Sequence, residues 1–178
     1  MSEIKKERSY TVHRVGSLPP DVDAAKHITD LFSSTGEFTR VLLQPGKEYN
    51  LYSKILMQAN HQELATEGYP TDNASKAKLY TRSETESGAI NAINKENIAI
   101  RCLHIIGLRE QMGWLKDGAA LIIIGGWDAK DPVLERCKLS DPRGWSCCHL
   151  VDGSQGGRVI SNGESGLTWC VLRSKAIG

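Results

Sequence analysis

Apolar residues recur every three or four positions through much of residues 20–117, the spacing that places side chains on one face of an α-helix. A first helix is predicted from residue 20 to Gly36, since glycine commonly follows a helix end. A second helix is predicted over residues 47–67. The third, over residues 89–108, is apolar on almost its whole circumference, which is typical of a helix buried on several sides. We therefore expect it to be the central helix of the domain.

Apolar runs of strand length, separated by glycines, dominate the chain after Gly118. Residues 119–124 form a continuous apolar run, which favours a central strand covered on both faces. The predicted strands are 9–15, 37–43, 119–124, 145–151, 157–161 and 167–173. The glycine-containing residues 162–166 separate the last two strands and predict a β-hairpin.

These elements predict an α+β fold, with helices mainly in the first two thirds of the chain and a glycine-rich sheet and hairpin region in the last third. Helices are expected within residues 20–117 and most strands within residues 119–175. The length of 178 residues suits a single compact domain over residues 9–178, preceded by a polar N-terminal arm at residues 1–8. The content of 40% hydrophobic and 24% charged residues is ordinary for a globular protein.

The charge balance and the apolar runs exclude some classes of protein. The 22 Lys and Arg residues nearly balance the 21 Asp and Glu residues, so the net charge of +1 gives no global attraction to nucleic acid or to an anionic membrane. The longest apolar run, residues 119–126, is much shorter than the roughly 20 residues of a transmembrane helix. The five cysteines are an odd number, and the charged N-terminus lacks the apolar segment of a secretory signal. These features predict reduced thiols and a cytoplasmic protein without a membrane-spanning segment.

The adjacent residues Cys147, Cys148 and His149 are the most conspicuous candidates for catalysis. In a strand, Cys147 and His149 would share one face and Cys148 would occupy the other. An imidazole beside a thiol favours the nucleophilic thiolate, so a small cysteine-dependent enzyme is one alternative. A structural role is favoured instead, because cysteine is among the most buried residue types. The chain has no paired-ligand spacing for zinc and no glycine-rich phosphate motif, so neither a metal nor a cofactor is predicted.

Basic residues in two parts of the chain are candidates for charged contacts within an assembly or with nucleic acid. The N-terminal arm contains Lys5, Lys6 and Arg8, and the second group consists of Lys76, Lys78 and Arg82. If folding brings Lys5, Lys6 and the last three together with Arg158 and Arg173, Tyr80 and the tryptophans could stack on bases, which makes an RNA-binding module the second alternative. The arm at residues 1–8 has too little apolar surface to offset the entropy of ordering it within one monomer, so we expect it to contact a neighbouring subunit.

The function predicted from these observations is that of a non-enzymatic, self-assembling structural protein, such as a coat, matrix or scaffold subunit. The near-neutral charge, the polar arm and the lack of a convergent catalytic set of side chains favour it. The expected partners are further copies of the same chain, with RNA as the alternative partner.

Overall fold

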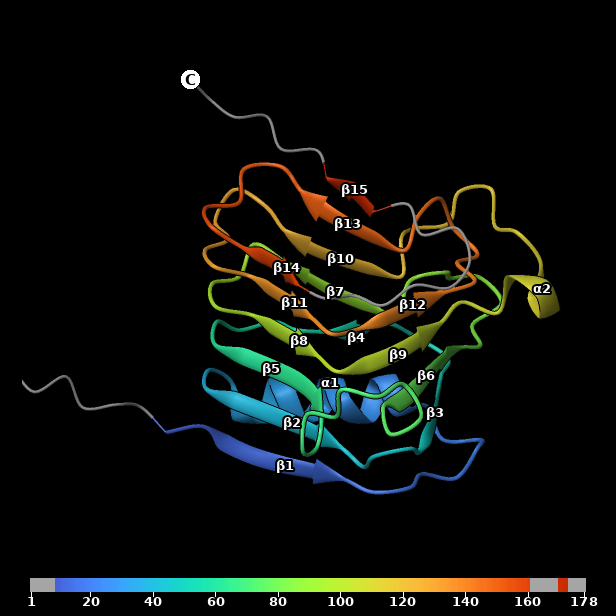
Figure 1. Ribbon diagram of the computed structural model, residues 1–178, viewed down its shortest axis with the longest axis horizontal. Helices are drawn as coiled ribbons and strands as arrows, with labels where there is room; N and C mark the ends of the chain where they lie inside the picture. The colour runs from blue at the N-terminus through green and yellow to red at the C-terminus, as the bar shows by residue number, and fades with distance from the viewer. Residues whose placement is uncertain (1–8, 161–169, 173–178) are drawn as a thin grey trace, which may run out of the picture.

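The computed structural model describes residues 9–160 and 170–172, whose paired strands all run parallel and form three sheets. Between residues 39 and 151 the chain passes through the three sheets in a fixed order and then returns to the first sheet, one strand further along. Each such passage is called a coil, and β8 (Ala99–Arg101), β9 (Leu103–Ile106) and β10 (Ile122–Gly125) form one of them. Figure 1 shows the coils stacked from β1 at the bottom to β15 at the top. The architecture is therefore a parallel β-solenoid.

The strands of each sheet come from successive coils. Sheet A contains β1 (Thr11–Val15), β2 (Thr39–Leu43), β5 (Gln62–Thr66), β8 (Ala99–Arg101), β11 (Val133–Glu135) and β14 (Arg158–Ile160). Sheet B contains β3 (Glu48–Leu51), β6 (Ala77–Thr81), β9 (Leu103–Ile106) and β12 (Lys138–Ser140). Sheet C contains β4 (Ile55–Leu56), β7 (Ile90–Ile93), β10 (Ile122–Gly125), β13 (Cys148–Val151) and β15 (Cys170–Leu172).

The corner between sheets A and B can be as short as one residue. In the coil formed by β8, β9 and β10, strand β8 ends at Arg101 and β9 begins at Leu103. The residue between them, Cys102, has a φ of 54°. This left-handed backbone conformation is uncommon for residues other than glycine, and here it bends the chain from one sheet into the next. Left-handed residues also stand at the entrance to sheet A, at Phe38, His61, Asn97 and Asp131. Sharp bends of this kind allow each strand to be short.

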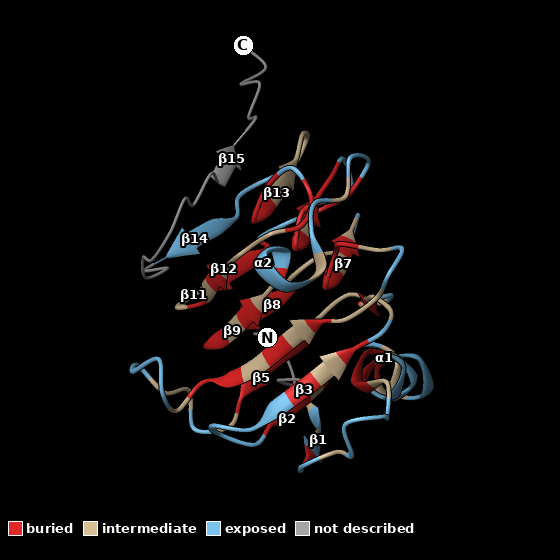
Figure 2. Cartoon of the chain, turned by 90° about the vertical axis from the view of Figure 1, so that its right-hand side faces the viewer, coloured by how far each residue is buried: buried red, intermediate tan, exposed pale blue. Residues whose placement is uncertain are grey.

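Inward-facing side chains from all three sheets meet in one hydrophobic core. On sheet A, Val41, Leu64, Ile100 and Leu134 occupy equivalent positions of consecutive paired strands, and all four are buried. Because alternate residues of a strand point to opposite faces, the residues between them point outward. Figure 2 shows this arrangement, with buried positions alternating along the strands and exposed positions concentrated in the loops.

The helix α1 (Ala24–Thr35) covers the core at the N-terminal end of the solenoid (Figure 1). Asp23 caps it, since one carboxylate oxygen accepts a hydrogen bond from the Ala25 N–H at 3.0 Å. Its buried side chains, which include Ile28 and Phe32, join the core below β2, β3 and β4. A polar-faced cap of this kind is what a solenoid needs where its stacking ends.

The predicted α+β fold is wrong, because the regular elements of the described residues are mostly strands and include only two short helices, α1 and α2 (Arg109–Met112). The helix predicted from residue 20 to Gly36 is confirmed by α1. Residues 47–67, predicted as helix, instead contain β3, β4 and β5. Residues 89–108, predicted as the central helix, contain β7, β8 and β9.

The misleading helical spacing has a physical cause in the corners. Ile98 and Ile100 lie two residues apart and face the core, but Leu103 follows after three, because the bend at Cys102 consumes one residue. Inward positions of short strands and their corners therefore recur at a mixture of two- and three-residue spacings. Such a mixture resembles the period of a buried helix in the sequence.

The predicted strands are largely confirmed, whereas two of the three predicted helices are wrong. Strands β1, β2, β10, β13 and β14 lie within or overlap the segments predicted for them. The predicted hairpin is wrong, because β14 belongs to sheet A whereas β15 belongs to sheet C, where it pairs with β13 in parallel. The turn at residues 162–166 lies outside the described residues, and so does the predicted arm at residues 1–8. Neither helix of the described part of the chain is long and apolar enough to cross a membrane.

Candidate anion-binding face

The outward face of sheet B carries a row of ionisable side chains. Glu48, Lys78, His104 and Lys138 occupy equivalent positions on β3, β6, β9 and β12, because each is the register partner of the next. Paired strands lie about 4.8 Å apart, so the row runs along the solenoid axis with one side chain per coil. The four residues are far apart in the sequence, and parallel pairing alone brings them into line.

A second row on the same face lies beside the first. It consists of Asn50, Tyr80, Ile106 and Ser140. Arg82 joins this row, since its Nε donates to the Asn50 Oδ1 at 2.6 Å and its guanidinium lies over the Tyr80 ring, 5.5 Å from the centroid. The Tyr80 hydroxyl donates to Glu48 Oε1 at 3.2 Å. Arg82 and Tyr80 are therefore held against the sheet.

Lys76 stands directly before β6, at the edge of this face, and is only 3% exposed. Its Nζ donates to the Asn73 Oδ1 at 2.8 Å. Among the described residues no carboxylate forms an ion pair with Lys76. Lysine is rarely buried without an opposite charge, because removing an ammonium group from water is costly. Lys76 is thus a buried cation that lacks a counter-charge from the described part of the chain.

His104 lies at the centre of this group. Burial, together with the positive charges of Lys138, Lys78 and Lys76, lowers the pKa of His104 to about 4. The imidazole is therefore neutral at neutral pH. Its Nε2 lies 3.2 Å from the Oγ of Ser140 on the adjacent strand. The register of the strands places Lys78 and Lys138 on either side of His104, so positive charge gathers in one small region of the surface.

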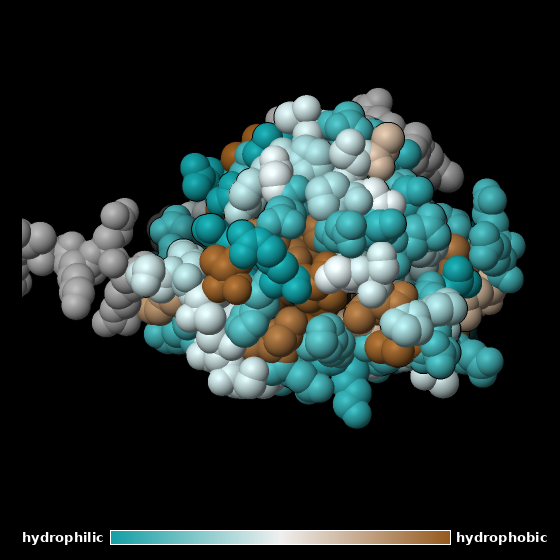
Figure 3. All heavy atoms as spheres, turned by 90° about the horizontal axis from the view of Figure 1, so that it is seen from below, coloured by the Kyte–Doolittle hydropathy of each residue, from teal (hydrophilic) through white to brown (hydrophobic). Residues whose placement is uncertain are grey.

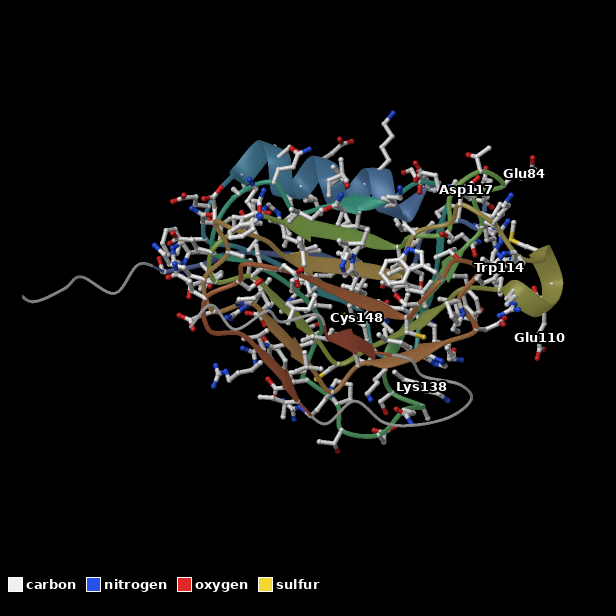
Figure 4. All side chains as sticks on the ribbon, turned by 90° about the horizontal axis from the view of Figure 1, so that it is seen from above. Glu84, Glu110, Trp114, Asp117, Lys138 and Cys148 are labelled. Carbon is white, nitrogen blue, oxygen red and sulfur yellow. The ribbon has the colours of Figure 1, made fainter. Side chains whose placement is uncertain are left out.

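We call these side chains, Lys76, Lys78, Arg82, His104 and Lys138, the basic face. Lys78 is partly neutralised by Glu48, whose Oε1 is 3.3 Å from its Nζ. Lys138, like Lys76, has no ion-pair partner within the described residues. Figure 4 shows Lys138 at the margin of the strands opposite the one where Glu84 and Asp117 lie. The basic face is therefore a region of net positive charge on a nearly neutral protein.

The outward face of sheet A also carries charges, but they are paired with one another. Glu63, 5% exposed, accepts hydrogen bonds from Arg40 Nε at 3.0 Å and from the Tyr69 hydroxyl at 2.7 Å. Glu135 pairs with both Arg101 and Arg136. Burial and the hydrogen bond to Glu63 raise the pKa of Tyr69 to about 12. These pairs stabilise the stack of coils and leave less uncompensated charge than the basic face has.

Cys147 and Cys148, the candidate nucleophiles, are both buried in the core and each is 1% exposed. His149 points outward from β13, and its ring meets the Trp145 ring edge-on at a centroid distance of 4.8 Å. The strand begins only at Cys148, so Cys147 does not share an exposed face with His149. Burial of both thiols is unfavourable for a cysteine-dependent enzyme, because its nucleophile must reach a substrate.

The structure places Lys76, Lys78 and Arg82 on the outward face of sheet B, whereas Arg158, which the RNA-binding alternative grouped with them, lies on β14 of sheet A. The residues that sequence reasoning missed are His104, Lys138 and Ser140. No fixed spacing could have found them, because loops of different lengths separate the strands of sheet B. Lys5, Lys6, Arg8 and Arg173 lie outside the described residues. Within the described ranges, no group of three or more His, Cys, Asp or Glu side chains is placed to hold a metal ion.

Comparisons of the chain with protein-family models, curated protein sequences and solved structures gave no match. The fold and the basic face therefore carry the functional interpretation.

Proposed function

We propose that this β-solenoid binds an extended acidic polysaccharide, one with carboxylate or sulfate groups, along the basic face. The observation that carries the proposal is that Lys78 and Lys138 are the register partners of His104 on the two adjacent strands, with Lys76 directly before the strand of Lys78. Lys76 is buried there without a carboxylate partner among the described residues. An anion from outside the chain would supply the missing counter-charge.

The shape of the site supports a polymer as the ligand. The row that contains Lys78, His104 and Lys138 crosses successive coils at a regular separation of about 4.8 Å per strand. A chain with repeated anionic groups can lie along such a row and contact several cations at once. Each contact adds to the others, so weak single contacts produce useful affinity.

The same face is less suited to nucleic acid. Proteins that bind single strands stack bases on aromatic rings, and readers of duplex DNA place a helix or ribbon in a groove. Tyr80 is the aromatic member of the two rows on this face, and the Arg82 guanidinium already lies over its ring. Because the Arg82 guanidinium already covers the Tyr80 ring, this sheet face favours an anionic sugar chain over RNA as the ligand.

Binding of labelled alginate, which is carboxylated, and of heparin, which is sulfated, tests the proposal. Neutral dextran and the RNA poly(U) serve as the comparison ligands. We expect one or both acidic polysaccharides to bind, with affinity that falls as salt increases. The variant Lys138→Glu should weaken binding roughly tenfold, a change of about 1.4 kcal/mol. The matched variant Lys26→Glu, on the exposed side of α1, should bind like the parent protein.

Three results would overturn the proposal. The first is that neither alginate nor heparin binds at low salt. The second is that Lys26→Glu weakens binding as much as Lys138→Glu does. The third is that poly(U) binds more tightly than both polysaccharides, which would establish the RNA-binding alternative instead.

A second candidate function is the self-assembly predicted from the sequence, and the edge of sheet A favours it. Strand β1 is the last strand of that sheet, and the arm at residues 1–8 directly precedes it. Val12 on β1 is 38% exposed. Seen from below, apolar side chains gather in a hollow at the centre of the end that carries β1 and α1 (Figure 3). Exposed strand edges readily pair with another chain. As part of this second proposal, we expect the self-assembling protein to be cytoplasmic, as the odd number of cysteines predicts.

A further inference from the structure

We propose that Ser140 and His104 are a nucleophile and a general base that hydrolyse carboxylic esters carried by an acidic polysaccharide on the basic face. This inference rests on the proposed binding function and adds a reaction to it. It starts from one contact, in which the His104 Nε2 lies 3.2 Å from the Ser140 Oγ. A serine and a histidine within this distance are the arrangement that activates a serine hydroxyl.

The backbone holds the two side chains in place. His104 is on β9 and Ser140 is on β12, and these strands are paired so that Lys138 is the register partner of His104. Both residues point outward and are partly exposed, so a ligand on the face can reach them. Side chains on adjacent strands of a sheet keep their relative positions better than side chains on loops. The pair is therefore rigid and accessible.

The lysines around the pair connect catalysis to binding. The groups that act on His104 are Lys78 from β6, Lys138 from β12 and Lys76 from the segment before β6, and Glu48 on β3 is paired with Lys78. Without a ligand, burial and then the three ammonium groups lower the pKa of His104 to about 4 and oppose its taking a proton. A bound polyanion offsets part of their positive charge and makes the imidazole a better base. The pair is thus most active when the substrate polymer is bound.

The reaction balances without any group beyond water. The Ser140 Oγ attacks the ester carbonyl carbon and forms a C–O bond while its proton passes to the His104 Nε2. The lysine ammonium groups stabilise the negative oxygen that develops. The bond to the alcohol of the polysaccharide then breaks, and that alcohol takes the proton from His104. Water, deprotonated by His104, hydrolyses the acyl-Ser140, releases the carboxylic acid and restores the hydroxyl.

The test measures acetate release from O-acetylated alginate and, separately, binding of unacetylated alginate. The parent protein should release acetate. Ser140→Ala and His104→Gln should each reduce the rate about 100-fold or more, in line with the usual contribution of general acid–base catalysis. Ser140→Ala should bind alginate as the parent protein does. The control Ser34→Ala, on the exposed part of α1, should keep the parent rate.

Two further readouts are specific to the chemistry. A fluorophosphonate reagent should modify Ser140 in the parent protein, as located by peptide mass spectrometry, and should not modify it in His104→Gln. Alginate should also raise the pKa of His104 measured by NMR in the Ser140→Ala variant. If that variant binds alginate but Ser140 is never modified and no acetate is released by the parent protein, the catalytic inference is wrong while the binding function stands. If the parent protein binds no acidic polysaccharide, the binding function itself fails.

Discussion

Ile100 and Leu103 belong to the same coil but enter the core from different sheets, because Cys102 bends the chain between them. Both side chains are fully buried. Truncation of either to alanine should lower the free energy of unfolding by about 2–5 kcal/mol, through lost burial and the cavity that remains. Ile106 points outward from the same strand as Leu103 and is partly exposed, so Ile106→Ala should cost less than about 1 kcal/mol. Denaturant unfolding measures all three, and parent-like stability of both core variants would contradict the solenoid core.

Lys76 should lower the stability of the protein while it contributes to ligand binding. Replacing it with methionine keeps most of its volume and removes a buried charge that has no acidic partner in the described part of the chain. We expect Lys76→Met to raise the free energy of unfolding by about 1 kcal/mol and to weaken alginate binding. Lys78→Met is the control, because Lys78 is more exposed and already paired with Glu48. It should weaken binding without raising stability, and a destabilised Lys76→Met would show that the ammonium serves the fold.

Tyr69 should make the protein sensitive to alkaline pH. Its pKa is raised from 10.0 to about 12, chiefly by burial and by its hydrogen bond to Glu63. The folded protein therefore holds this proton more tightly than the unfolded chain does. The stability that this difference provides is present below pH 10 and is lost as the pH rises towards 12. Unfolding followed across this range should show a steeper decline in the parent protein than in Tyr69→Phe. Equal declines would mean that another group is responsible.

The buried cysteines should matter for stability and not for activity. Cys147→Ser and Cys148→Ser each place a hydroxyl in an apolar core, which should cost about 1–3 kcal/mol. Alginate binding by the folded variants should stay unchanged, because neither residue lies on the basic face. Rapid labelling of either thiol by a thiol reagent in the native protein would instead favour the cysteine-dependent enzyme.

The N-terminal arm gives a test of self-assembly. Deleting residues 1–8 should leave the solenoid folded and impair any self-association, since Lys5, Lys6 and Arg8 are the expected charged contacts. Salt should have the same effect, because exposed charges are screened within about 8–10 Å at physiological ionic strength. Sedimentation of both proteins in low and high salt measures this, and a variant with the three basic residues changed to glutamine separates the role of charge from that of length. If full-length and truncated proteins sediment as the same monomer, the self-assembly candidate loses its support.

Local patterns in the sequence were sufficient for some elements. The helix α1 follows from its apolar stripe and from Gly36 at its end, both within one short segment. The burial of Ile100 and Leu103 was also predictable, because both belong to a dense apolar run, although that run was assigned to a helix. The run at residues 119–124 contains most of β10 for the same reason. Each of these features depends on residues that are close together in the sequence, so local patterns are enough to predict it.

What the sequence by itself determined was thus the apolar content of each segment, the helix α1 and several strands. Tertiary structure decided which strands pair and therefore where the side chains of the basic face meet. Lys78, His104 and Lys138 align because parallel pairing of β6, β9 and β12 places them in register across loops of unequal length. Register is set by backbone hydrogen bonds between coils and by packing of the inward side chains, both of which join residues distant in the sequence. The physical basis of the candidate site is therefore non-local, and no short motif records it.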